Sequence, residues 1–135
     1  MRDFEALVAF IEAQQGKPFA WGRGRNDCVS YGARAVKALT GRDRLRAIRQ
    51  RWTSASGARR ALAAVGGLEA GMDSLFERVS PSTAKRGDLG LAVMASGPSL
   101  VVIEGETVVG PGATGNERLP RAALTAAWDV ESEAS

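Results

Sequence analysis

The sequence contains no histidine among its 135 residues. For the chain by itself, this absence excludes the standard mechanisms that need an imidazole as a base, as a zinc ligand or as a phosphate carrier. The single cysteine, Cys28, cannot form a disulfide within the chain, and it cannot build a metal site from several thiolates. We therefore expect neither a metal nor a cofactor.

Long hydrophobic runs are also missing. No apolar stretch approaches the roughly 20 residues that a membrane-spanning helix needs, so we expect no membrane span. The N-terminal residues Met-Arg-Asp-Phe-Glu carry acidic side chains early and lack the apolar core of a signal peptide, so secretion is not expected.

What is present is typical of a globular protein. Hydrophobic residues make up 44% of the chain and charged residues 24%, and the length is close to that of one average domain. We predict a single domain over residues 1–130 and a polar C-terminal tail over residues 131–135.

Charge is distributed unevenly along the chain. The net charge is +3, but residues 1–65 carry 13 basic and 5 acidic side chains, whereas the remainder carries 5 basic and 10 acidic ones. Seven arginines lie within residues 42–60, where Asp43 is the only acid. Nucleic-acid binding also calls for aromatic side chains that stack on bases, and only Trp52 is nearby, so we expect no nucleic acid. An acidic protein surface and a simply solvated helical face both remain compatible with this cluster. The candidate binding residues are Arg42, Arg44, Arg46, Arg49, Arg51 and Trp52.

Helical patterns dominate the first half of the chain. Asp3 and Asp27 precede apolar residues at helical spacing and are candidate N-caps, while Gly16 and Gly41 are candidate helix stops. The predicted helices span residues 3–15, residues 27–40 and, in pieces, residues 43–79.

Short strands are predicted in the second half. After Ser80-Pro81-Ser82, short apolar and β-branched runs alternate with glycines, which is typical of antiparallel strands. The predicted strands span residues 89–94, 100–103, 107–109 and 126–130, with a turn over 110–116 and a helical turn over 120–124. Because helices come first and strands second, the predicted class is α+β. The predicted core, where the second helix meets the sheet, contains Trp21, Cys28, Tyr31, Leu39, Leu89, Leu91, Leu100, Val102 and Trp128.

Two segments carry residues of chemical interest. Trp21-Gly22 is followed by Asn26-Asp27-Cys28 at a predicted helix start, and Arg86-Gly87-Asp88 precedes the first predicted strand. A cysteine in the first turn of a helix can be a nucleophile, because unpaired N–H groups and the helix dipole lower the pKa of its thiol. The alternative is that Cys28 is a small buried hydrophobic residue, and its position alone favours this alternative.

The ordered set of motifs resembles the NlpC-type cell-wall peptidases, which have a papain-like fold. A small bacterial and phage branch of that superfamily joins Pro-Phe-Trp-Gly-x-x-Asp-Cys to a Thr-Gly-Arg-Asp helix end, an Ala-Gly-Gly-Leu turn and Arg-Gly-Asp. This chain has Thr40-Gly41-Arg42-Asp43, Val65-Gly66-Gly67-Leu68 and Arg86-Gly87-Asp88 in that order. The resemblance implies N-terminal helices packed on a small antiparallel sheet, with Cys28 at the nucleophile position. The structural motif residues that it implies are Trp21, Gly22, Asp27, Arg86, Gly87 and Asp88.

The chain departs from active members of that superfamily at the catalytic base. Where active members have a histidine at the start of the second strand, the matching stretch here begins with Ser99. A hydroxyl is not a useful base near neutral pH, and the Asp27 carboxylate beside Cys28 would raise the pKa of the thiol. N-capping of the helix is the more natural role of Asp27. We therefore expect the fold to be kept and the peptidase chemistry to be lost.

Three functions of different classes remain open. The first is a structural component of a phage-type tail tip without peptidase activity, because the resembling proteins are encoded among tail genes of long-tailed phages and gene transfer agents. Its partners would be hub and tip proteins, and it would be assembled in the host cytoplasm and found in the virion. The second is an active cysteine peptidase or amidase that cuts peptidoglycan with a base from elsewhere, and the third is a module that only binds the cell wall. The missing base and the arginine-rich segment favour the first.

Overall fold

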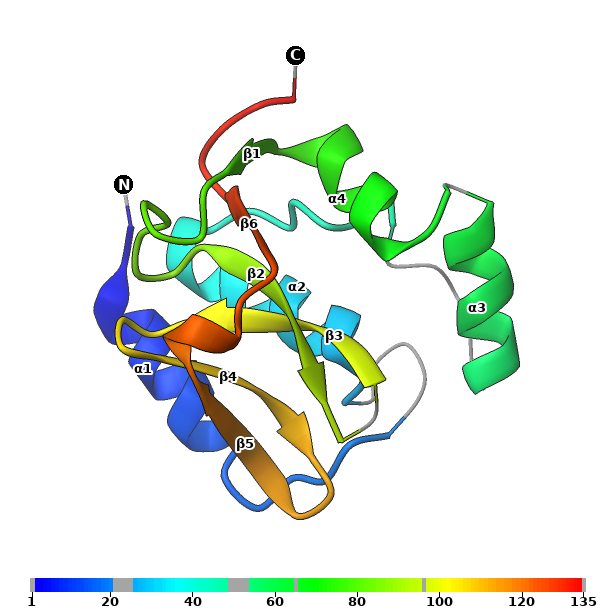
Figure 1. The fold of residues 1–135 in the computed structure, drawn as a ribbon. Helices are drawn as coiled ribbons and strands as arrows, with labels where there is room; N and C mark the ends of the chain where they lie inside the picture. Colours follow the sequence, from blue (N-terminus) through cyan, green and yellow to red (C-terminus); the bar gives the residue numbers. More distant parts are fainter. Residues whose placement is uncertain (1, 21–25, 49–53, 65, 96, 135) are drawn as a thin grey trace.

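The computed structural model describes residues 2–20, 26–48, 54–64, 66–95 and 97–134 (Figure 1). Within these residues, helices form the first part of the chain and strands the second, so the predicted α+β class is confirmed. The helices are α1 (Phe4–Ala13), α2 (Cys28–Thr40), α3 (Ala55–Ala63) and α4 (Leu68–Leu75). The strands are β1 (Glu77–Val79), β2 (Leu89–Met94), β3 (Gly97–Ile103), β4 (Thr107–Gly112), β5 (Gly115–Pro120) and β6 (Ala126–Asp129), and a 3-10 turn, η1 (Arg121–Ala123), precedes β6.

Both of the first two helices begin at the predicted caps, and α2 ends at the predicted glycine, whereas α1 ends at Ala13, before the predicted stop at Gly16. The Asp3 carboxylate accepts a hydrogen bond from the N–H of Ala6, and the Asp27 carboxylate accepts one from the N–H of Ser30 at 2.8 Å. These contacts satisfy backbone donors that the first turn of a helix leaves unpaired. Helix α2 ends at Gly41, whose φ of +79° is the left-handed conformation that glycine adopts most easily.

The strands of the described residues form one antiparallel sheet in the order β1-β6-β2-β3-β4-β5. Helices α1 and α2 pack on one face of it, while α3 stands apart from the sheet beside α4 (Figure 1). Because side chains alternate between the faces of a strand, β3 contributes Leu100 and Val102 to the core under α2. Its residues Val101 and Ile103 belong to a second, smaller cluster on the opposite face.

Three predictions for the middle of the chain are wrong. Residues 77–79, predicted as helical, form β1, which pairs with β6 through Glu77 and Asp129. Residues 44–48, also predicted as helical, form a turn. The predicted turn over residues 110–116 is instead a hairpin, because β4 continues to Gly112 and pairs with β5. For residues 77–79 and 110–116, pairing with strands elsewhere in the sheet decides the conformation. In residues 44–48, Leu45 and Ile48 have helical spacing, but both are buried from a turn.

Strand β5 lies at an edge of the sheet and has an unusual composition for a strand. Its sequence, Gly-Asn-Glu-Arg-Leu-Pro, contains two charged residues and a proline, and only Gly115 in it is buried. Charged residues and proline are typical of edge strands, where one row of backbone groups has no partner strand. The short strand β1 forms the other edge, and the N–H of Glu77 donates to the Ser132 hydroxyl.

The core lies where α2 meets the sheet, as predicted. Of its predicted members, seven are buried, Leu91 is half-buried and Trp21 lies outside the described residues. Helix α2 approaches β3 so closely that a Cβ at Gly32 would lie 2.9 Å from the side chain of Leu100. The buried predicted members are Cys28, Tyr31, Leu39, Leu89, Leu100, Val102 and Trp128.

We expect Leu100→Ala to lower the free energy of unfolding by about 2–5 kcal/mol, because it removes a fully buried side chain beneath α2. Urea denaturation followed by circular dichroism measures this loss. The matched control is Val93→Ala, whose 67% exposed side chain should contribute within about 0.5 kcal/mol. Equal stability of the two variants would contradict the placement of β3 in the core.

Candidate functional site

Cys28 is the first residue of α2, and its thiol is buried against β3. Its pKa is raised from 9.0 to about 11, chiefly because burial disfavours the thiolate, and the nearby Asp27 carboxylate raises it further. Hydrogen bonds from the backbone of Leu100, Cys28 and Val29 act in the opposite direction but do not compensate. The helix start therefore does not activate this cysteine, and its environment is that of a structural residue.

Ser99 lies on the other side of the sheet from Cys28. In the β2–β3 register, Ser99 pairs with Ala92 and Leu100 pairs with Leu91. Ala92 belongs to the cluster on the face away from α2, so alternation places the Ser99 side chain on that face too. The Ser99 hydroxyl donates to the carbonyl of Gly97 at 2.9 Å.

The structure therefore does not bring Ser99 to the thiol, contrary to the position that the resemblance implied for a base. The residue of β3 whose backbone meets the thiol is Leu100, and its side chain packs under α2. A leucine neither accepts nor donates a proton. Cys28 is thus buried in the core, and the residue of β3 that faces its thiol carries no proton.

Asn26 fixes the loop that precedes Cys28. Its side-chain amide donates to the carbonyls of Lys17 and Pro18, and its side-chain oxygen accepts from Arg34 of α2 at 3.0 Å. Its backbone N–H and C=O pair with Ala20. Asn26 thereby joins Ala20 and the segment before it to the start of α2. Trp21 and Gly22, two predicted motif residues, lie outside the described residues.

A second asparagine that the sequence did not single out joins three elements. The Tyr31 hydroxyl of α2 donates to the side-chain oxygen of Asn116 in β5 at 2.8 Å. The Asn116 amide in turn donates to the carbonyl of Ile11 in α1 at 2.8 Å. Burial raises the pKa of Tyr31, and the Phe10 ring packs edge-on against its ring at 5.2 Å. No local sequence pattern signals these contacts, because their partners are 85 and 105 residues apart.

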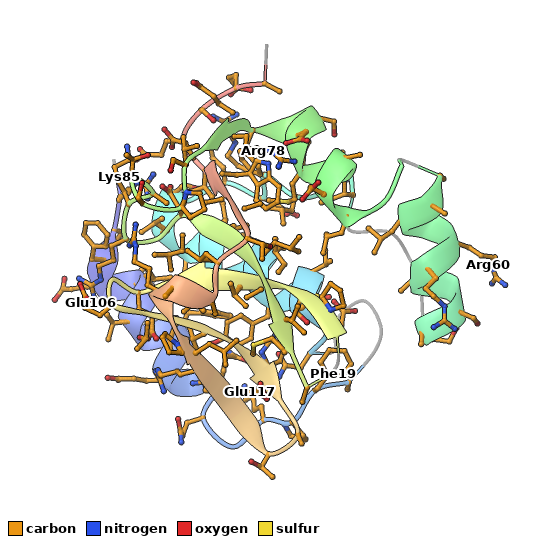
Figure 2. The ribbon with its side chains drawn as sticks, in the orientation of Figure 1. Phe19, Arg60, Arg78, Lys85, Glu106 and Glu117 are labelled. Atoms are coloured by element: carbon orange, nitrogen blue, oxygen red, sulfur yellow. The ribbon has the colours of Figure 1, made fainter. Side chains whose placement is uncertain are left out.

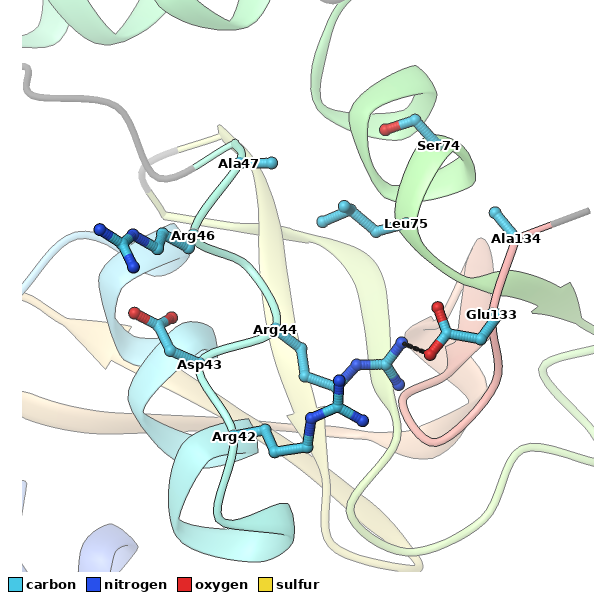
Figure 3. Close-up of a pocket in the computed structure, with 9 residues that line it drawn as sticks. All are labelled: Arg42, Asp43, Arg44, Arg46, Ala47, Ser74, Leu75, Glu133 and Ala134. Carbon is cyan, nitrogen blue, oxygen red and sulfur yellow. Dashed lines mark ion pairs between the residues drawn. The ribbon is translucent and has the colours of Figure 1, made fainter.

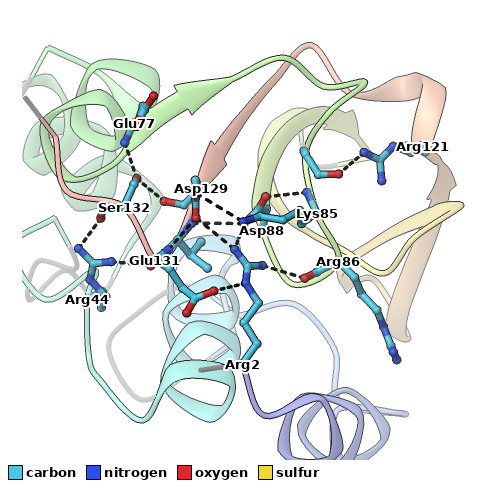
Figure 4. A network of polar contacts seen from close by, with 12 residues as sticks. Arg2, Arg44, Glu77, Lys85, Arg86, Asp88, Arg121, Asp129, Glu131 and Ser132 are labelled. Carbon is cyan, nitrogen blue, oxygen red and sulfur yellow. Dashed lines mark hydrogen bonds and ion pairs between the residues drawn. The ribbon is translucent and has the colours of Figure 1, made fainter.

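The Arg86-Gly87-Asp88 motif has a structural role at the start of β2 (Figure 4). The buried Asp88 carboxylate binds the guanidinium of Arg2 at 2.6 Å and also accepts from the backbone N–H groups of Lys85 and Val130. Arg2 donates in addition to the carbonyl of Arg86 at 2.8 Å. The Gly87 φ of +92° and the 2.6 Å between its ideal Cβ position and Leu39 explain why glycine stands there.

The predicted polar tail is held by the same network. Asp129 and Glu131 both pair with Arg2, which lowers the pKa of Glu131 (Figure 4). The Ser132 hydroxyl accepts from the N–H of Glu77, and the N–H of Ala134 donates to the carbonyl of Leu75. Residues 131–134 therefore pack against the domain.

The predicted arginine cluster forms one wall of a cavity of about 450 Å³, which we call the arginine cavity (Figure 3). Helix α4 and the C-terminal segment form the opposite wall. Of the predicted binding residues, Arg42, Arg44 and Arg46 line it, whereas Arg49, Arg51 and Trp52 lie outside the described residues. The complete lining consists of Arg42, Asp43, Arg44, Arg46, Ala47, Ser74, Leu75, Glu133 and Ala134.

Arg44 differs from its two neighbours in the arginine cavity. Its guanidinium donates to the carbonyls of Val130 and Ser132, pairs with Glu133 at 3.0 Å and lies 4.8 Å from the centre of the Phe76 ring. Its side chain is only 9% exposed. Arg44 is therefore a fixed part of the fold, whereas Arg42 and Arg46 are exposed.

The described part of the chain contains neither a membrane-spanning helix nor a cluster of metal-ligating side chains. None of its helices is both long enough and apolar enough to cross a membrane. None of its groups of histidine, cysteine, aspartate and glutamate side chains is arranged to hold a metal ion.

We expect the Cys28 thiol to react slowly with iodoacetamide near neutral pH. The raised pKa lowers the thiolate fraction at pH 7 about 100-fold relative to an ordinary cysteine, and only the thiolate attacks the reagent. Mass spectrometry of quenched samples should show a rate that rises with pH up to about 11. The control is the protein in urea, and a native rate at pH 7 that matches this control would refute the buried-thiol description.

We expect Asp88→Asn to lower the free energy of unfolding by about 3 kcal/mol, because it removes the charge of the most deeply buried of the three carboxylates that pair with Arg2. Arg118→Gln breaks the more exposed pair with Glu104 and should cost less than about 1 kcal/mol. Urea denaturation of both variants measures the difference. Similar losses would show that Asp88 does not have this structural role.

Comparison with known proteins assigns the chain to a family. No curated protein matches the sequence. A family model described as a domain of unknown function, DUF6950, matches residues 2–130. The matched range contains Arg2, Cys28 and Asp88, and it includes the whole sheet. Because the match covers almost the entire chain, the protein belongs to the DUF6950 family.

Proposed function

We propose that this protein is a structural component of a phage-type tail tip, built on an NlpC-like domain that has lost peptidase activity. The observation that carries the proposal is the environment of Cys28: the resemblance gives this residue the position of a nucleophile, but its thiol is buried and its pKa is raised. The papain-like relationship itself rests on the ordered sequence motifs. An α-helix beginning at the cysteine and packed on an antiparallel sheet is compatible with it.

The chemistry of a cysteine peptidase needs two things from the groups around the thiol. The thiol must be deprotonated, and the leaving amine must receive a proton. With a pKa of about 11, only about one thiol in ten thousand is ionised at pH 7. Asp27 is used as a helix cap, and Leu100 on the facing strand carries no proton. This arrangement supports a structural role for Cys28.

The distribution of arginines supports docking on an acidic protein. Arg42 and Arg46 are exposed at the arginine cavity, and Arg59 and Arg60 are exposed on α3, where Arg60 points outward from the fold (Figure 2). Exposed charges of one sign speed up association with an oppositely charged surface and make it sensitive to salt. We propose hub and tip proteins as the partners, with assembly in the host cytoplasm and a final place in the virion.

The test is mass spectrometry of purified particles from the encoding strain. We expect the protein at a fixed low copy number, and we expect deletion of its gene to give particles without tips or without infectivity. Complementation with Cys28→Ala should restore infectivity, because the proposed role needs no thiolate. The absence of the protein from mature particles would overturn the proposal.

A peptidoglycan-digestion assay distinguishes the proposed structural role from the enzymatic alternative. Purified protein incubated with peptidoglycan should release no fragments, since the thiol is protonated near neutral pH. Fragment release that Cys28→Ala abolishes would instead assign a peptidase or amidase activity. Retention on the wall without release would identify a binding module.

A further inference from the structure

We propose that the arginine cavity binds a carboxylate of an acidic protein segment, and that Glu133 of this chain occupies part of that site until the partner displaces it. This inference rests on the proposed function for the identity of the partner. Its physical basis is the arrangement of charges around the cavity, which Figure 3 shows from close by.

Arg44 gives the arginine cavity a cation that is already fixed in place. Two backbone carbonyls and the Phe76 ring hold its guanidinium, so little side-chain entropy is lost when an anion binds there. The two carbonyls are neutral, and among the residues that the structure describes the carboxylate paired with Arg44 is that of Glu133. A fixed guanidinium that already binds a carboxylate has the chemistry to bind another.

Glu133 is a weak occupant of this position. Its side chain is 76% exposed, and ion pairs of exposed groups contribute little stability. The backbone on both sides is held independently, because Ser132 contacts Glu77 and Ala134 contacts Leu75. A rotation of the Glu133 side chain therefore frees the arginine without unfolding the segment.

Arg42 and Arg46 provide additional positive charge around the same cavity. Both are exposed, and within the described part of the chain neither side chain forms an ion pair. The lining has a net charge of +1, from three arginines against Asp43 and Glu133. Exchange of the Glu133 carboxylate for a carboxylate of the partner leaves this balance unchanged.

The remaining lining indicates which kind of acidic segment fits. Ala47, Leu75 and Ala134 provide an apolar surface beside the guanidinium groups. A segment in which glutamates alternate with leucines would place its carboxylates on the arginines and its apolar side chains on this surface. A protein partner offers both kinds of group, so we commit to an acidic protein segment.

The probe is a fluorescently labelled peptide, Leu-Glu-Leu-Glu-Leu-Glu, and the readout is anisotropy at low salt. The matched ligand replaces each glutamate with glutamine and should bind at least about tenfold more weakly, because charge recognition drives binding. Glu133→Gln should tighten binding of the acidic peptide up to about fivefold, because it removes the internal competitor of an exposed pair. Arg42→Gln with Arg46→Gln should weaken it about tenfold.

Arg118→Gln is the control, because Arg118 is an exposed arginine of β5 that pairs with Glu104 away from this cavity. Equal binding of the two peptides, or equal loss in the control and in the Arg42→Gln/Arg46→Gln variant, would overturn the inference. Tighter binding of a short DNA oligonucleotide or of inorganic phosphate would overturn it in favour of a phosphate site. These binding measurements do not depend on whether the protein is found in phage particles. The carboxylate site can therefore be refuted while the tail role is supported, and the tail role can be refuted while the carboxylate site is supported.

Discussion

The buried ion pair between Arg2 and Asp88 connects parts of the chain that are far apart in sequence. Removing two charges from water is costly, and such a pair is tolerated only when further hydrogen bonds satisfy its polar atoms. Here the carboxylate also accepts from Lys85 and Val130, and the guanidinium also donates to Arg86. The start of β2, the N-terminal segment ahead of α1 and the segment after β6 meet at this point. The C-terminal wall of the arginine cavity therefore depends on a contact at the other end of the chain.

The close approach of α2 to β3 explains the state of Cys28. Gly32 allows the helix to lie directly on Leu100, and Asp27 fixes the first turn one residue before the cysteine. Both features press the thiol against the backbone of β3 and exclude water from it. The raised pKa thus follows from the packing that stabilises the core.

The sequence predicted the features that depend on local chemistry. The caps at Asp3, Asp27 and Gly41 lie where expected, because each involves backbone groups within four residues. The strands β2 and β6 were found because their apolar pattern faces a core. The strands β1 and β5 were missed because their residues are mostly exposed or half-buried, so only pairing with distant strands specifies them.

The candidate site was predictable to a smaller extent. Asp27 was recognised as a cap and as a group that raises the pKa of the thiol, and both statements agree with the structure. The face on which Ser99 lies depends on the register of β3, which a single sequence does not reveal. The sequence grouped Arg44 with the surface arginines because one of its partners is a backbone carbonyl 86 residues away. Every residue has a backbone carbonyl, so the sequence does not indicate which one an arginine binds.

The edges of the sheet limit how copies of this protein can meet. Where copies of a protein are close together, an open strand edge invites β-addition and aggregation. Strand β5 opposes this with Glu117, Arg118 and Pro120, and β1 is only three residues long, with the N–H of Glu77 already bound to Ser132. Both ends of the sheet therefore disfavour association of copies through strand addition, so the fold can stay separate even where its copies are crowded.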